Sequence, residues 1–289
     1  MHGLLLLHKP TGMTSNAALA RVKRHLKTKK AGFAGTLDPM ATGVLPIALG
    51  EATKCLPYIE DVDKEYEFTV CWGVETDTLD AEGKIIKEQG AAPTETEIRK
   101  ILPQFTGEIW QTPPAFSAIK INGQRAYDLA RAGQAVEIKS RRITIYDLDH
   151  VGDARFRVRC TKGTYIRSLA RDMAHGLGTL AHLTALSRTK VGKFPLSDTI
   201  LLDNFLELPY QEAAQRVMPI RRMLDDILAI RLEQGALRRL SQGQSLRQPF
   251  AAATFPPGTH VLLLDGEAAF GIGVIKDDTQ LWPRRLFNL

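Results

Sequence analysis

Hydrophobic and polar residues follow one another along the chain in patterns that predict both strands and helices. The leucine-rich stretch 3–8 is short and continuously apolar, as in a buried strand. Thr14 can cap a helix over 15–26, and Thr94 with Glu97 forms a capping-box pattern. By the same criteria we expect strands over 44–49, 65–74, 143–146 and 154–160, and helices over 51–59, 94–101, 126–132 and 166–177.

The pattern changes near residue 229. Beyond it, short β-like runs such as 260–264 and 271–275 are separated by turn-forming glycines and prolines. We therefore expect two domains. Residues 1–228 should form a mixed α+β domain with a mostly antiparallel sheet flanked by helices, and residues 229–289 a small β-rich domain.

Composition narrows the class of protein. Hydrophobic residues make up 44% of the 289 residues and charged residues 24%, which are ordinary globular values. No stretch approaches the ~18 apolar residues that span a membrane. Cys55, Cys71 and Cys160 are odd in number and widely spaced, which fits neither a disulfide framework nor a zinc ribbon. We expect a soluble, cytoplasmic protein without a bound metal.

The positive charge is unevenly distributed. The net charge of +6 is modest, but basic residues gather over 21–30, over 139–142 and on one face of the expected strand 154–160. A single such group is compatible with a solvated surface, whereas three favour contact with nucleic-acid phosphates. The residues that we expect to contact an RNA backbone are Arg21, Lys23, Arg24, Arg141 and Arg142.

Two segments carry candidate chemistry. Residues 32–43 read GFAGTLDPMATG, in which a proline keeps the preceding Asp38 out of a helix. Residues 162–169 place Tyr165 and Arg167 where a strand passes into a helix. The glycines match neither the dinucleotide fingerprint nor the P-loop. From these patterns alone, a turn role for Asp38 and structural roles for the other two residues remain open.

Taken together, the segments resemble the TruB family of tRNA pseudouridine synthases, which isomerise uridine 55 in the T loop of tRNA. The end of the chain, with Pro283-Arg284-Arg285-Leu286, resembles the small PUA-like domain of the bacterial members. The resemblance is carried by motifs in a fixed order, namely Lys9-Pro10-x-Gly12-x-Thr14-Ser15, the Gly-x-x-Gly-x-Leu-Asp-Pro-x-Ala-Thr-Gly segment, Lys64-x-Tyr66, Lys162-Gly163-Thr164-Tyr165-Ile166-Arg167 and Leu186-Ser187-Arg188-Thr189.

The resemblance implies roles for individual residues. Asp38 would be the catalytic aspartate and Arg167 its ion-pair partner. Tyr66 would stack on the flipped base and take part in proton transfer. Phe33 stands where the family usually has a histidine that helps to hold the T loop open; it can stack but cannot donate a hydrogen bond. The residues implied to bind the uridine are Phe33, Tyr66, Tyr165 and Leu186.

The implied reaction needs no cofactor and no metal, because it oxidises nothing and adds no outside group. The Asp38 carboxylate could attack C1′ of the ribose or remove a proton from C2′ to give a glycal, and the sequence does not decide between these routes. The expected partner is the T-stem and loop of a tRNA, bound by a monomer. A non-catalytic tRNA-binding chaperone and a glycosidase-like hydrolase remain as alternatives; the hydrolase would require a second carboxylate beside Asp38.

Overall fold

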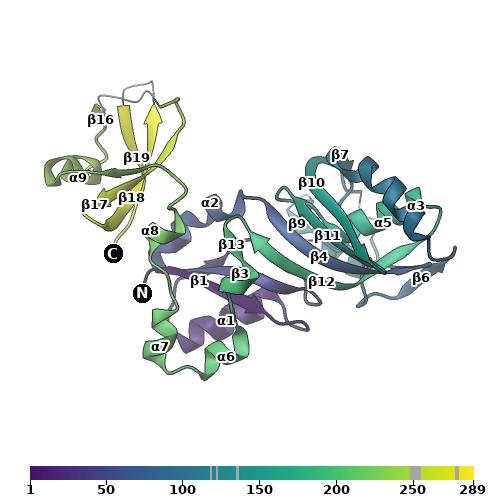
Figure 1. Ribbon diagram of the computed structural model, residues 1–289. Helices are drawn as coiled ribbons and strands as arrows, with labels where there is room; N and C mark the ends of the chain where they lie inside the picture. The colour runs from purple at the N-terminus through teal and green to yellow at the C-terminus, as the bar shows by residue number, and fades with distance from the viewer. Residues whose placement is uncertain (118, 122, 135–136, 248–254, 277–279) are drawn as a thin grey trace.

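The computed structural model describes residues 1–117, 119–121, 123–134, 137–247, 255–276 and 280–289. Most of these residues surround a ten-stranded mixed sheet (Figure 1), whose order is β14-β1-β3-β12-β4-β11-β10-β7, with β13 on β12 and β2 on β3. Its neighbours run antiparallel except β1 with β14 and β3 with β12, which confirms the predicted fold class. The long strands are β1 (Gly3–Lys9), β3 (Thr42–Leu49), β4 (Lys64–Trp72), β10 (Arg141–Gly152), β11 (Arg155–Cys160) and β12 (Ala181–Val191).

Shorter elements complete this part of the chain. The helices are α1 (Ser15–His25), α2 (Leu56–Glu60), α3 (Glu95–Ile101), α4 (Ala126–Arg131), α5 (Ile166–Gly176), α6 (Leu202–Glu207), α7 (Tyr210–Gln215) and α8 (Ile220–Met223). The short strands of the large sheet are β2 (Ala31–Phe33), β7 (Gly107–Gln111), β13 (Phe194–Pro195) and β14 (Ile200–Leu201). Two separate hairpins are formed by β5 (Val74–Thr76) with β6 (Ile85–Glu88) and by β8 (Lys120–Ile121) with β9 (Gln124–Arg125). None of the helices in the described ranges is long and apolar enough to cross a bilayer.

The predicted helix caps are confirmed. Thr14 accepts a hydrogen bond from the N–H of Ala17 at the start of α1, and both halves of the Thr94–Glu97 capping box are present at α3. The predicted helix over 51–59 is only partly correct. A 3₁₀ turn covers Gly50–Cys55, and α2 follows with Pro57 in its first turn, where the missing N–H leaves no hydrogen bond unmade.

Two of the three outward arginines of β11 have acidic partners on the neighbouring strand. The residues of this strand alternate between exposed and buried, as predicted. Arg157 lies 3.0 Å from Asp149, and Arg159 lies 2.8 Å from Asp147, with each acid on β10. Arg155 lies on the same exposed face. The arginine alternation therefore has an explanation as a cross-strand ion-pair surface, without any contact with phosphate.

The last part of the chain forms a second, five-stranded sheet in the order β15-β17-β18-β19-β16. Its long strands β17 (His260–Asp265), β18 (Ala268–Lys276) and β19 (Gln280–Leu286) pair antiparallel, and the shorter β15 (Ala229–Arg231) and β16 (Leu246–Arg247) lie at its edges. Helix α9 (Gln234–Ser241) was not predicted. Figure 1 shows this sheet beside α2 and α8, close to the N-terminus.

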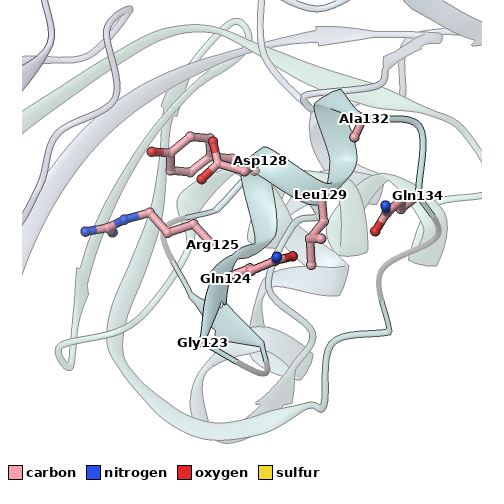
Figure 2. Close-up of a pocket in the computed structure, with 8 residues that line it drawn as sticks. Gly123, Gln124, Arg125, Asp128, Leu129, Ala132 and Gln134 are labelled. Carbon is pink, nitrogen blue, oxygen red and sulfur yellow. The ribbon is translucent and has the colours of Figure 1, made fainter.

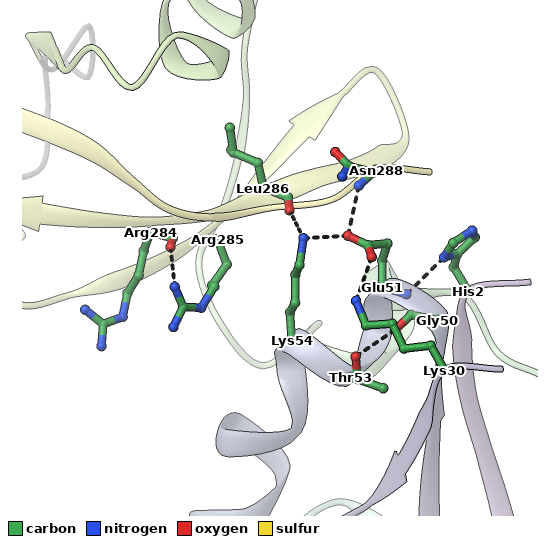
Figure 3. A network of polar contacts seen from close by, with 10 residues as sticks. All are labelled: His2, Lys30, Gly50, Glu51, Thr53, Lys54, Arg284, Arg285, Leu286 and Asn288. Carbon is green, nitrogen blue, oxygen red and sulfur yellow. Dashed lines mark hydrogen bonds and ion pairs between the residues drawn. The ribbon is translucent and has the colours of Figure 1, made fainter.

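Buried apolar and polar contacts both join the two sheets. Leu264 of β17 and Phe287, directly after β19, belong to the same hydrophobic cluster as Leu4 of β1. Next to this cluster, the Glu51 carboxylate accepts hydrogen bonds from Lys30 at 2.8 Å, Lys54 at 2.6 Å and the N–H of Asn288 at 3.0 Å (Figure 3). Hydrogen bonds from the two lysines lower the pKa of Glu51 to about 2. Glu51 therefore stabilises the contact between the sheets as an ionised group.

Candidate active site

Asp38 lies in the loop between β2 and β3, and the N-terminal motif fixes that loop on both sides of it. On one side, the hydroxyl of Ser15 accepts a hydrogen bond from the N–H of Leu37 at 2.9 Å. On the other side, the ammonium group of Lys9 donates to the carbonyl of Pro39 at 3.3 Å. The Asp38 side chain between these anchors is 35% exposed. The motif over 9–15 therefore holds the backbone and leaves the carboxylate free to meet a substrate.

Lys9 is a buried cation at the base of this loop. Its ammonium group also donates to the carbonyls of Pro10 at 2.8 Å and Met13 at 2.6 Å. Burial lowers the pKa of Lys9 to about 8, and the negative charge of Asp38 opposes that shift. The amine thus joins β1, the turn after it and the loop that carries Asp38 in one hydrogen-bonded unit.

Arg167, in the first turn of α5, lies against Asp38 as predicted. Its guanidinium is 2.9 Å from the Asp38 carboxylate and only 5% exposed. A second carboxylate, that of Asp80, lies 3.5 Å away and is 4% exposed. The same guanidinium donates to the carbonyls of Thr78 at 2.8 Å and Phe116 at 3.0 Å. Arg167 is therefore held in one orientation by three segments of the chain.

The sequence analysis missed Asp80. Its carboxylate accepts hydrogen bonds from the hydroxyl of Thr78 at 2.6 Å and from the N–H of Glu82 at 3.0 Å. Both bonds go to one oxygen, while the other oxygen is the one nearest Arg167. An Asx-type turn ending in Gly83 was the available signal, but within an acidic stretch it had an ordinary surface explanation.

Tyr66 and Arg188 lie opposite each other on the paired strands β4 and β12. Arg188 is 1% exposed, and its guanidinium donates to the carbonyls of Val44 at 2.8 Å and Gly35 at 3.0 Å. Because directly opposed residues of an antiparallel strand pair share a face of the sheet, the Arg188 and Tyr66 side chains are neighbours. Burial raises the pKa of Tyr66, and Arg188 acts in the opposite direction. The structure thus adds to the site an arginine that the sequence analysis quoted only as part of a motif.

Arg188 also explains two glycines near Asp38, Gly35 in the same loop and Gly43 at the start of β3. Gly43 has a φ of +107°, and a Cβ at this position would lie 2.3 Å from the carbonyl oxygen of Arg188. Gly35 has a φ of +71°, and its Cβ would lie 3.0 Å from the Arg188 guanidinium. Only glycine combines these backbone angles with so close an approach.

Two further predicted pocket residues lie on elements that contribute to the site. Leu186 is buried two residues before Arg188, and it pairs with Phe68 on the neighbouring strand. It therefore shares a face of the sheet with Tyr66 as a diagonal neighbour. Tyr165 directly precedes α5, and its backbone N–H and carbonyl are both hydrogen-bonded by the side chain of Gln111, at 2.8 and 3.1 Å.

Each of the other predicted residues has contacts of its own. Phe33 ends β2 opposite Ile47 and packs, half-buried, against the main core. Arg141 stacks on the Tyr165 ring at 4.9 Å. Two of the remaining basic residues expected to contact RNA have acidic partners: Arg21 lies 4.0 Å from Asp203, and Arg142 pairs with Glu108. The other two, Lys23 and Arg24, lie in the last turn of α1. Their contact with RNA stays a prediction.

A hollow of about 510 Å³ lies away from these residues, in the segment that follows the Pro113-Pro114 loop (Figure 2). It is lined by residues of β9, α4 and the turns beside them, namely Gly123, Gln124, Arg125, Tyr127, Asp128, Leu129, Ala132 and Gln134. Its lining lacks a residue of the Asp38 cluster, so the candidate chemistry depends on the cluster and not on this hollow.

Comparisons with known proteins identify the family of this chain. Residues 23–166 match a family model described as TruB family pseudouridylate synthase (N terminal domain). Residues 167–229 match the tRNA pseudouridylate synthase B C-terminal domain, and residues 229–287 match Pseudouridine synthase II TruB, C-terminal.

Similar full-length proteins and structures are also known. The tRNA pseudouridine synthase B of Rhizobium meliloti is 47% identical over 99% of this chain and 95% of its own length. That of Bradyrhizobium diazoefficiens is 44% identical over 100% of this chain and 86% of its own. Among solved structures, a similar chain occurs in an H/ACA RNP bound to a substrate RNA containing 2′-deoxyuridine. The TM-score is 0.76 at 24% identity, and the match covers 99% of this chain and 85% of that one, so the two chains share a fold. By its sequence, this chain belongs to the TruB family of pseudouridine synthases.

Proposed function

We propose that this tRNA pseudouridine synthase isomerises uridine 55 in the T loop of tRNA, with Asp38 as the catalytic carboxylate. The observation that carries the proposal is the ion pair between the buried Arg167 guanidinium and the partly exposed Asp38 carboxylate, at 2.9 Å. It occurs in a chain whose curated relatives bear the name tRNA pseudouridine synthase B.

The reaction breaks the N1–C1′ bond of uridine, turns the detached base and joins C5 to C1′. Positive charge develops at C1′ as the first bond breaks, as in glycoside hydrolysis. An ionised Asp38 can attack C1′ or take a proton from C2′. Arg167 pairs with the Asp38 carboxylate and fixes its direction, and Asp80 in turn fixes Arg167.

The base must first leave its stack, which costs a few kcal/mol. Stacking on the half-buried ring of Tyr66 would return ~1–3 kcal/mol. The Tyr66 hydroxyl can then exchange protons with the base. Leu186, buried on the same face, would keep water from capturing C1′. Tyr165 and Phe33 would complete the contact with the flipped nucleotide.

The tRNA would bind by its T-stem and loop to one copy of the chain, in the cytoplasm. Arg21, Lys23, Arg24, Arg141 and Arg142 would contact phosphates. Residues 229–289 would act as a PUA-like RNA-binding domain, with 1–228 as the catalytic domain. The exposed Arg284 and Arg285, on β19 beside the contact between the two sheets (Figure 3), support an RNA-facing role for this region.

The test uses the purified chain and an unmodified tRNA transcript, with pseudouridine mapped at single-nucleotide resolution. We expect product at the T-loop uridine, and none with Asp38→Asn, although that variant should still bind the tRNA. Tight binding without product by the wild-type chain would instead support the chaperone alternative. Free uracil as the product would support the hydrolase.

A further inference from the structure

Arg188 is a buried cation whose described hydrogen bonds go to uncharged groups. It is among the largest fully buried side chains of the protein. Its guanidinium donates to the carbonyls of Val44, Gly35 and Ala34, and Tyr66 lies directly opposite it on the neighbouring strand. Within the described residues, no carboxylate lies at ion-pair distance from it. Burying a guanidinium without a counter-ion costs folding free energy. We therefore looked for a function in which the positive charge of Arg188 is used.

The neighbouring Arg167 shows the contrast. It is buried to a similar degree, but two carboxylates face it, those of Asp38 and Asp80. Positive charge at Arg167 is therefore balanced in the resting enzyme. Arg188 has no such carboxylate partner among the described residues, and the ionisable side chain directly opposite it on the paired strand is the Tyr66 phenol.

The other charged groups around this pair do not supply that balance. Lys64, on the strand of Tyr66, donates to the carbonyls of Glu60 at 2.5 Å and Val62 at 2.6 Å. Cys160, on β11, is a neutral thiol because burial raises its pKa to about 11. Asp38, in the loop between β2 and β3, carries a negative charge that opposes the ionisation of Tyr66. Lys9 is a further cation near Arg188.

We propose that Arg188 is the positioning residue for Tyr66: it fixes the phenol oxygen and stabilises the negative charge on that oxygen while Tyr66 serves as the base for the C5 proton. This inference rests on the proposed function. A cation already in place in a site that excludes water stabilises developing charge most effectively, since nothing must reorganise. Without Arg188, burial and Asp38 would both hold the phenol in its neutral form.

The proton transfers balance. Once C5 is bonded to C1′, the hydroxyl proton of Tyr66 passes to N1 of the base. The phenolate oxygen then takes the proton from C5. The electron pair of the C5–H bond forms the C5=C6 double bond, while the electrons of the former C6=N1 double bond remain on N1 as it gains its proton. Tyr66 ends as a phenol, and the base has moved one proton from C5 to N1.

A purely structural role is the competing explanation, because Arg188 also holds the backbone of Gly35 and Val44. Either role predicts a slower enzyme when Arg188 is replaced. A readout of the Tyr66 proton affinity separates them. We would replace Tyr66 by a fluorinated tyrosine, whose phenol titrates at lower pH, and follow its ¹⁹F resonance in the enzyme without RNA.

Arg188→Met should raise the titration midpoint of residue 66 by about one pH unit or more. Arg188→Gln, which keeps amide donors for the loop carbonyls, should raise it too and serves if Arg188→Met does not fold. Lys64→Met is the matched control, since it removes a buried cation from the same strand pair and should leave the midpoint nearly unchanged. An unchanged midpoint in a folded Arg188 variant would overturn the proposal.

A kinetic arm uses single-turnover pseudouridine formation. Arg188→Gln should slow the chain at least about tenfold when Tyr66 is present, and far less in the Tyr66→Phe background, because the two residues act as one unit. Equal slowing in both backgrounds would mean that Arg188 acts only through the loop. Since the titration needs no RNA, a wild-type chain that fails to modify tRNA is a separate result that tests the proposed function alone.

Discussion

The second carboxylate behind Arg167 offers the sharpest test of how the site is organised. Asp80→Asn removes one negative charge and keeps the shape of the side chain, including an oxygen for the hydroxyl of Thr78 and the N–H of Glu82. Arg167 keeps its ion pair with Asp38 at 2.9 Å and loses the one at 3.5 Å. The change therefore affects the orientation of Arg167 more than the local fold.

The magnitude follows from the geometry. At 3.5 Å and an effective dielectric constant of about 20, the attraction between Arg167 and Asp80 is about 5 kcal/mol. The cost of keeping a buried carboxylate out of water offsets much of it, and Asn does not carry that cost. A net loss of about 1–3 kcal/mol remains. If Arg167 must be oriented for Asp38 to react, the single-turnover rate should fall roughly tenfold to a hundredfold.

The assay pairs urea unfolding with single-turnover pseudouridine formation on a tRNA transcript. Asp172→Asn is the matched control, since Asp172 also pairs with an arginine of α5, Arg171 at 2.8 Å, but at a partly exposed position. It should change stability by less than about 1 kcal/mol and leave the rate unaltered. A wild-type rate in a folded Asp80→Asn enzyme would refute the claim that Asp80 orients Arg167.

Three other changes test separate parts of the structure. Tyr66→Phe should slow single-turnover product formation by about a hundredfold or more, to a low but measurable rate, and retain tRNA binding in a filter assay, because the ring remains and the hydroxyl is lost. Gly43→Ala should destabilise the protein by about 2 kcal/mol more than Gly12→Ala in urea unfolding, since only at Gly43 would the Cβ meet the Arg188 backbone. Glu51→Gln should lower the free energy of unfolding by about 3 kcal/mol at neutral pH, because the pKa of Glu51 is lowered to about 2. The wild type has this stability above pH ~4.5 and loses it as the pH falls towards 2, so unfolding measured against pH should show that loss in the wild type only.

Local rules were sufficient for the elements whose stabilising contacts are local. The caps of α1 and α3 depend on residues within three positions of one another, and both are formed as predicted. The alternation of β11 also holds, since a half-buried strand displays its burial directly in its sequence. These cases need no knowledge of the rest of the chain.

Strand β12 shows where local rules fail. It lies between β3 and β4 in the middle of the sheet, yet the sequence analysis proposed no strand there. Its pairing with β4 is interrupted by register shifts at Leu183/Ala185 and Arg188/Lys190. Each shift reverses the faces of the following residues, so no single period of two extends through the strand. The two neighbouring strands that stabilise it are distant in the sequence.

The same reasoning applies to the site. Asp38, Tyr66 and Arg167 could be predicted because each belongs to a short motif, and the structure places two of them in direct contact. Asp80 and Arg188 act through partners more than 80 residues away, Arg167 for one and the loop at Gly35 for the other. No spacing rule connects such positions. The sequence does show one partner of the contact, Gly43. This residue is a glycine because the Arg188 backbone occupies the space that a side chain would need. An unexplained glycine close to a candidate catalytic aspartate is therefore a signal that a second, distant strand completes the site.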